Sequence, residues 1–375
     1  MMKKNAFKIT MMAVFCLTTN FLGAPEMKAF TPKKPVVKRQ AIRKSSGKGV
    51  VITNLYNNPD SATWIRKGKG GIIISKDSAG VVRAMTPHTV NTAASRLYAE
   101  AIQEYGKILK DDGVKVYSLL APSQGEYYMP EMISPCGSER KTIVATKEVF
   151  DPSLVTAVLI CDTLKNHVNE EIYNRTDHHW SPLGGHYAAK ALAAAAGVPF
   201  RPLSDYKEEV VRNYVGTMYK FSGDPQIKNY PEEFVYYLPP TGYRCEFITY
   251  KLSNGKTIGE GEPYSSDFFR KFPDGSGAAY CTFMGGDQST VKVTDTGGTP
   301  GRKVLLVKDS YGNAMASNLF GSFEEVHVID FRYFPHNLID YVRDNGITDL
   351  VFIHSLAIGI SPKSVARFNT LRTQK

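Results

Sequence analysis

Three residues of this chain have types and spacings that suit acyl transfer. Asp177 stands two residues before His179, so its carboxylate can reach the inner ring nitrogen and fix the tautomer of the imidazole. Far downstream, Ser310 stands where a predicted strand turns into a helix, which exposes a nucleophile beside amides that can stabilise an oxyanion. The three together predict a Ser-His-Asp triad that forms an acyl-enzyme.

Each part of this constellation also has another explanation. An Asp-x-His turn can simply cap the helix that follows it, and a serine before a helix is a common N-cap. A metal hydrolase is a further alternative, since carboxylate and imidazole suit zinc or manganese. Four such side chains lie close in sequence: Asp177, His178, His179 and His186. Adjacent histidines rarely bind one ion, and no His-Glu-x-x-His motif occurs, so no metal is predicted.

The acid and the imidazoles lie on a short turn before a predicted helix. Ser181 is a good N-cap, and Pro182 suits the first helical position. The Ala-rich run 187–196 continues the helix, and Gly197 ends it.

The C-terminal part of the chain alternates between strand and helix patterns. Strands are predicted over 302–308, 325–331 and 349–353, with helices over 314–320 and 337–345 between them. Upstream, 89–109 predicts a helix and 114–120 a strand, and 152–167 also looks helical. This series predicts an α/β fold with parallel strands and right-handed crossovers. Functional groups then gather at the carboxyl ends of the strands: Ser123, Ser310, Arg332 and His354.

The run Asp177-His178-His179-Trp180 resembles the signature of the bacterial DHHW protein family. It is also similar to the Asp-Thr-His-Trp turn of the periplasmic alginate O-acetyltransferase-like proteins, which belong to the SGNH hydrolase-like group. The resemblance covers roughly 114–197 and 302–356. It implies a three-layer, flavodoxin-like parallel sheet that is circularly permuted, because Asp-x-His precedes the serine. It also implies that Ser310 is the nucleophile, His179 the base and Asp177 its orienting acid.

The sequence departs from the SGNH pattern where the oxyanion hole is expected. His354-Ser355 stands in place of Gly-x-Asn, and Arg332 stands where a glycine is usual. The hole would therefore use the amides at 310–312 with other groups. The candidates for oxyanion or substrate contacts are Tyr311, Gly312, Asn313, Arg332, His354, His178 and Trp180. If the turn is extended, His178 faces away from His179 and has a structural or substrate role.

The rest of the chain divides into a leader, a linker and an insertion. Residues 1–29 match a signal peptide, with basic residues before an apolar stretch, although an uncleaved membrane anchor is an alternative. Residues 30–48 predict a basic disordered linker. The SGNH-like α/β domain is expected over 49–200 and 301–375. Between them, 201–300 predicts a β-rich insertion or lid, with strands over 233–238, 244–251 and 278–284.

Charge and composition restrict the partners. The net charge of the 375-residue chain is +10, but much of the excess lies before residue 49, and nothing predicts a nucleic-acid module. The basic linker is either a solvated tether or a contact for anionic lipid or polysaccharide. No P-loop occurs, and no glycine-rich turn opens a helix, so no cofactor is predicted. Four cysteines follow the leader, and Cys245 with Cys281 is the preferred disulfide.

Sequence and resemblance together predict an exported bacterial enzyme of the periplasm, envelope or exterior. It would add or remove O-acetyl groups on polysaccharide, and a membrane protein could supply the acyl group. Whether it is a transferase or an esterase stays open. The main alternative is a non-catalytic glycan-binding or envelope-assembly protein on the same fold.

Overall fold

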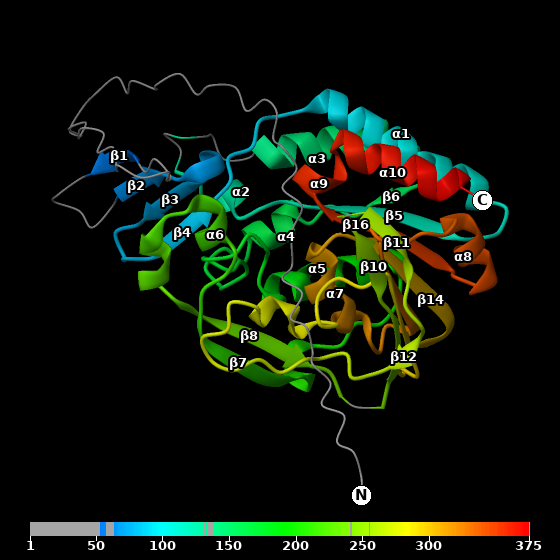
Figure 1. Ribbon diagram of the computed structural model, residues 1–375. Coiled ribbons are helices and arrows are strands. Elements are labelled where there is room, and N and C mark those ends of the chain that lie inside the picture. The colour runs from blue at the N-terminus through cyan, green and yellow to red at the C-terminus, as the bar shows by residue number, and fades with distance from the viewer. Residues whose placement is uncertain are drawn as a thin grey trace, which may run out of the picture.

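An eight-stranded sheet runs through the centre of the protein (Figure 1). The computed structural model describes residues 53–57, 64–130, 133, 138–240, 242–254 and 256–374. The predicted signal peptide and linker lie outside these residues. The strand order is β12-β9-β13-β15-β14-β16-β5-β6. The five strands from β15 to β6 are parallel, and the first four of them match predicted strands: β15 (Phe323–Asp330), β14 (Thr299–Lys308), β16 (Asp349–Ser355), β5 (Lys115–Ala121) and β6 (Thr156–Ala157).

Helices cover both faces of this sheet and make three layers (Figure 1). Alternate residues of β14 point to opposite faces, so Leu306 joins one apolar cluster and Leu305 the other. One cluster includes α1 (Thr92–Leu109), α3 (Ser138–Val149), α8 (Leu338–Asp344) and α10 (Pro362–Thr373). The other includes α4 (Cys161–Lys165), α5 (Pro182–Ala196) and α7 (Tyr311–Ala316).

Helix α5 is built as the sequence predicts. The side chain of Ser181 accepts a hydrogen bond from the Gly184 amide, and Gly197 takes the left-handed conformation that ends the helix. Gly185 lets α5 approach α7 closely, because a Cβ there would lie 2.7 Å from the carbonyl oxygen of Ala314. The two helices that begin next to His179 and Ser310 are therefore held side by side.

Most of the regular structure in 201–300 consists of β-strands, some of which extend the central sheet. This region contributes three antiparallel strands: β9 (Arg244–Ile248), β12 (Tyr264–Ser265) and β13 (Thr290–Thr294). It also forms two hairpins, β7 (Lys207–Tyr214) with β8 (Glu232–Leu238), and β10 (Tyr250–Ser253) with β11 (Lys256–Glu260). The strand predicted over 278–284 is wrong, because Ala279–Thr282 is a 3-10 helix and Met284 has a positive φ.

The N-terminal part forms a separate four-stranded antiparallel sheet (Figure 1). Its strands are β1 (Thr53–Asn57), β2 (Trp64–Lys67), β3 (Ile73–Lys76) and β4 (Val82–Met85). Ile74 and Val82 of this sheet pack with Met218 of α6 (Met218–Ser222) in a small apolar cluster. This cluster supports the segment that follows Thr217, which belongs to the site described below.

Two further expectations are settled by the described residues, whereas the membrane-anchor alternative over 1–29 lies outside them. The disulfide between Cys245 and Cys281 is not formed, since both are thiols. Cys245 lies buried on β9 opposite Val293, whereas Cys281 lies in the 3-10 helix Ala279–Thr282. The helix predicted over 152–167 is wrong, because β6 and the short α4 occupy it. None of the helices in the described ranges is long and apolar enough to cross a membrane.

Candidate active site

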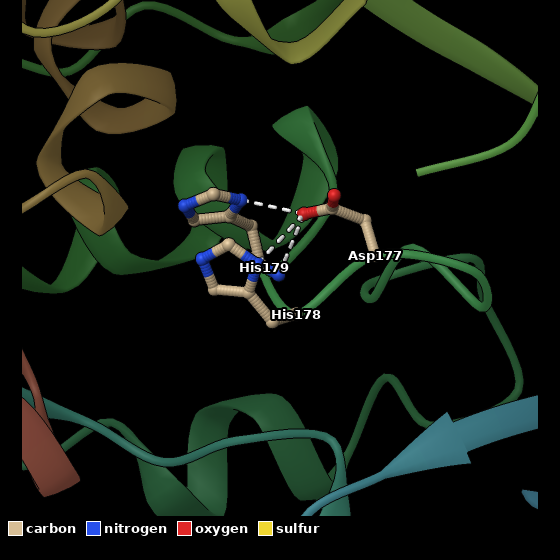
Figure 2. A group of neighbouring side chains, drawn as sticks. All are labelled: Asp177, His178 and His179. Carbon is tan, nitrogen blue, oxygen red and sulfur yellow. Dashed lines mark hydrogen bonds and ion pairs between the residues drawn. The ribbon is translucent and has the colours of Figure 1, made fainter. Parts of the chain in front are cut away.

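A continuous hydrogen-bonded chain joins Asp177, His179 and Ser310. The Nδ1 atom of His179 lies 2.5 Å from Oδ1 of Asp177, and its Nε2 atom lies 2.7 Å from Oγ of Ser310. Asp177 Oδ1 also accepts a hydrogen bond from the His179 amide, at 3.0 Å. Figure 2 shows the acid beside the inner nitrogens of both histidines. Asp177 and His179, on the turn before α5, thus meet Ser310, on the turn before α7, at the carboxyl edge of the central sheet.

The second oxygen of Asp177 is held by Thr217. Oδ2 accepts hydrogen bonds from the amide and the hydroxyl of Thr217, both at 2.8 Å. Burial alone would raise the pKa of this carboxyl, but the imidazoles of His179 and His178 and these hydrogen bonds outweigh it and lower the pKa well below its usual range. Asp177 is therefore a carboxylate at neutral pH, which fits an acid that orients a base.

Two buried side chains fix the backbone that leads into the turn. Gln124 donates from Nε2 to the carbonyl oxygen of Asp177 at 3.0 Å and also to that of Ala84 in the N-terminal sheet at 2.9 Å. Glu232 of β8 accepts hydrogen bonds from the amides of Arg175 and Thr176, both at 2.7 Å. The position of Asp177 thus depends on three separate parts of the chain.

His179 lies between two other rings. The His178 ring has its centroid 3.7 Å from that of His179, and the Tyr280 ring lies 3.8 Å away and nearly parallel, at 4°. Two rings this close to one centroid lie on opposite faces of it. The expectation that His178 faces away from His179 is therefore wrong: the turn is not extended, and His178 packs against the base (Figure 2).

Ser310 is fixed through the first residues of α7. The hydroxyl of Tyr280 donates to the Ser310 carbonyl oxygen at 2.9 Å. Tyr311 donates from its hydroxyl to the carbonyl oxygen of His178 at 2.6 Å, and Trp180 donates from Nε1 to the carbonyl oxygen of Tyr311 at 2.9 Å. Trp180 and Tyr311 therefore connect the histidine turn to the serine turn rather than face a substrate.

The amides expected to form the oxyanion hole are mostly occupied. The Tyr311 amide donates to Oδ1 of Asp309, and the Gly312 amide donates to the carbonyl oxygen of Asp309. The Ser310 amide, by contrast, makes no hydrogen bond to any of the described residues. It is the backbone donor that this turn leaves available for an oxyanion.

A buried cluster of charges lies next to Ser310. Lys308 is only 1% exposed and pairs with Asp287 and Asp330, at 2.8 Å each. Arg332 binds the same two carboxylates, at 2.7 and 2.6 Å. Asn313 donates from Nδ2 to Asp287 at 3.1 Å. Arg332 and Asn313 are thus held by partners within the protein, and this cluster joins Asp287 of the 201–300 region to the edge of the sheet.

Two other candidates lie away from the triad. His354 is fully buried, and its ring packs edge-on against Phe331 and at a tilt of 49° against Phe368. Because both ring nitrogens lack a partner among the described residues, burial lowers its pKa to about 3. The prediction that His354 contacts a substrate is wrong, since its side chain points into the core. Ser123 is bound by Glu139, through its hydroxyl at 2.5 Å and its amide at 2.7 Å.

The residues considered for a metal only partly come together. Single ligand atoms of Asp177, His178 and His179 lie within 4.8 Å of one another. His186 is elsewhere, on α5, with its Nδ1 atom 2.9 Å from Oδ1 of Asn318. Since Asp177 Oδ1 and His179 Nδ1 already bind each other, this donor set fits a proton relay better than an ion.

Sequence reasoning did not identify four residues that shape this site: Gln124, Thr217, Glu232 and Tyr280. Each reaches the triad from a distant segment, and no local pattern distinguishes it. For Gln124, the one signal in the sequence is its place beside Ser123, shortly after the end of β5.

Comparisons with known proteins agree with this architecture. A family model described as DHHW protein matches residues 83–329. A DHHW family protein from Eubacterium siraeum has 36% sequence identity and a TM-score of 0.70, over 80% of this chain and 95% of that chain. Bacillus cereus PatB1 with a sulfonyl adduct has 17% identity and a TM-score of 0.61, over 78% of this chain and 96% of that one.

The O-acetyltransferase domain of Pseudomonas putida AlgJ is a weaker match, with 14% identity and a TM-score of 0.41, over 84% of this chain and 100% of that one. No curated protein matches the sequence. The predicted α/β fold with a central, mostly parallel sheet is confirmed, and the chain shares its fold with PatB1.

Proposed function

The chain belongs to the DHHW protein family, and we propose that it is a serine acyl-ester enzyme that adds or removes O-acetyl groups on polysaccharide. The observation that carries this proposal is the hydrogen-bonded chain from Asp177 through His179 to Ser310. A base within hydrogen-bond reach of a hydroxyl, itself oriented by a buried carboxylate, is the arrangement that activates a serine.

The reaction follows from these contacts. His179 Nε2 takes the proton of the Ser310 hydroxyl while Oγ attacks the carbonyl carbon of the ester. The carboxylate of Asp177 keeps the Nδ1 proton in place and stabilises the imidazolium that forms. The Ser310 amide is the backbone donor for the oxyanion. His179 then returns the proton to the leaving alcohol, and the acyl-enzyme passes its acyl group to water or to another hydroxyl.

Three parts of the proposal rest on the family resemblance of the Asp177-His178-His179-Trp180 turn: the O-acetyl glycan substrate, the export from the cell and a membrane-bound acyl donor. They name O-acetylated polysaccharides as the first substrates to test. The basic segment 30–48 would hold such an enzyme close to anionic lipid or polysaccharide.

The first test is labelling of the purified protein with a fluorophosphonate probe. We expect the wild type to be labelled and to hydrolyse p-nitrophenyl acetate, and the Ser310→Ala and His179→Ala variants to lose both. Ser123→Ala is the matched control, because this serine also follows a strand but is bound by Glu139. Equal labelling of wild type and Ser310→Ala would reject the proposed nucleophile.

A glycan-binding protein without catalysis is the second candidate. It is favoured by the occupied amides of Tyr311 and Gly312 and by the buried His354, which leave a sparse oxyanion hole. A folded wild-type protein that binds polysaccharide but resists the probe and leaves p-nitrophenyl acetate intact would favour this candidate.

A further inference from the structure

The hydrogen bonds around Asp177 fix the tautomer of His178. The Thr217 hydroxyl lies 2.8 Å from Oδ2 of Asp177 and 2.7 Å from Nδ1 of His178. Because the carboxylate can only accept, the Thr217 proton points to Asp177, and the Thr217 oxygen accepts from His178. His178 therefore carries its proton on Nδ1, and its Nε2 atom keeps a lone pair.

This lone pair is available to a ligand. The His178 side chain is 28% exposed, and no group among the described residues hydrogen-bonds to its Nε2 atom. Burial and the neighbouring His179 lower the pKa of His178 to about 3, so the ring stays neutral at pH 7. Such a ring is a weak base but a good hydrogen-bond acceptor.

The acceptor nitrogens of the two histidines lie side by side. Figure 2 shows the outer nitrogens of His178 and His179 on the same side of the stacked rings, away from Asp177. The ring centroids are 3.7 Å apart. The Nε2 atom of His179 lies within hydrogen-bond distance of Oγ of Ser310, so a hydroxyl that attacks the acyl group on Ser310 must approach this nitrogen. The Nε2 atom of His178 lies next to that place.

We propose that Nε2 of His178 accepts a hydrogen bond from the hydroxyl adjacent to the one that reacts, so that the site selects acyl acceptors with hydroxyls on neighbouring carbons. The inference rests on the proposed function and specifies its acceptor: a vicinal diol, as a sugar ring carries. Two stacked acceptor nitrogens suit two neighbouring hydroxyls, whereas a simple alcohol offers only one.

The transfer step is balanced without a further reactant. The acceptor hydroxyl loses its proton to Nε2 of His179 as its oxygen bonds to the acyl carbon of the acyl-enzyme. The bond between that carbon and Oγ of Ser310 breaks, and His179 gives the proton to Oγ. The neighbouring hydroxyl keeps its own proton and donates a hydrogen bond to His178 throughout, so His178 orients the acceptor without taking a proton from it.

The test compares two acceptors that differ in one group. p-Nitrophenyl acetate acylates the enzyme, and ethylene glycol and 2-methoxyethanol compete for the acyl group, with both acetate esters measured by gas chromatography. Because both alcohols attack the same acyl-enzyme, the product ratio cancels any effect on acylation. We expect the wild type to favour the glycol about five- to tenfold per hydroxyl, as one hydrogen bond would give.

His178→Phe keeps a ring against His179 but removes the acceptor nitrogen, so we expect its ratio to fall to about one. His178→Gln, which can still accept, should fall between the two. A wild-type ratio near one, or the same ratio in wild type and His178→Phe, overturns the inference, and the wild-type comparison decides even if the variants do not fold. Absent p-nitrophenol release would instead reject the proposed function and the inference with it.

Discussion

Gly216 lies so close to Asp177 that a single methyl group should disturb the candidate triad. A Cβ atom at position 216 would lie 2.4 Å from Cβ and 2.5 Å from Oδ2 of Asp177. Carbon atoms in contact normally lie about 3.5–4.0 Å apart. The Gly216→Ala substitution therefore requires a displacement of about 1 Å between the two segments.

Two hydrogen bonds tie the segment of Gly216 to the segment of Asp177. The amide of Gly216 donates to Oγ1 of Thr176 at 2.9 Å, and the amide of Met218 donates to the Thr176 carbonyl oxygen at 3.0 Å. Both segments are thus tied together around the clash, so the displacement reaches the carboxylate of Asp177. A misplacement of about 1 Å in a catalytic group costs about 100-fold in rate.

The assay is kcat/KM for p-nitrophenyl acetate, together with thermal unfolding to confirm the fold. We expect Gly216→Ala to lose about 100-fold in kcat/KM. Gly277→Ala is the control, since its Cβ would lie 3.2 Å from the carbonyl oxygen of the nearby Val215 and meet no atom of the triad. We expect it to lose no more than about twofold. A Gly216→Ala protein with wild-type kcat/KM would refute the reasoning that this packing positions Asp177.

Three further predictions concern the stacked ring, a buried acid and metal. Tyr280→Leu removes the ring from His179 and should lower kcat/KM about fivefold to tenfold. Tyr280→Phe keeps the ring and loses only the hydrogen bond to the Ser310 carbonyl oxygen, so its loss should be smaller; equal losses would contradict a stacking role. Burial raises the pKa of Glu139 to about 7 despite its hydrogen bonds from Ser123. Because the folded state then holds a proton that the unfolded state releases, the free energy of unfolding should fall by up to about 3 kcal/mol as pH rises from about 4.5 to 7. Glu139→Gln should flatten that slope in denaturant titrations, and an unchanged slope would disprove the assignment. EDTA should leave fluorophosphonate labelling intact, whereas a loss that zinc restores would favour the metal hydrolase.

The sequence was most informative where local rules decide the structure. Ser181 and Pro182 start α5 and Gly197 ends it, as capping preferences predict. The apolar centres of β14, β15 and β16 identified the parallel strands, because such strands are buried on both faces. Ser361 before Pro362 repeats the signal of Ser181 and Pro182, so the start of α10 was also predictable.

The parts that were not predicted depend on contacts between distant segments. Thr217 and Tyr280 contact Asp177 and His179 only because the fold brings the region 201–300 back to them. Neither residue has a distinctive neighbour in the sequence. His354 lies at the carboxyl end of β16, where functional residues often lie, but its side chain points to the helix-covered face and not to the edge. The direction of one side chain at a strand end is set by the three-dimensional packing around it.

The separation of the triad along the chain has a consequence for folding kinetics. His179 and Ser310 are 131 residues apart, and β7 to β14 must be placed before they meet. Contacts of this range form late, because loop closure opposes them until the sheet is nearly complete. A chain that is being synthesised or refolded would therefore not react with esters until its last strands join the central sheet. For the proposed enzyme, the burst of p-nitrophenol would count native molecules, so its recovery over time would measure the completion of the fold.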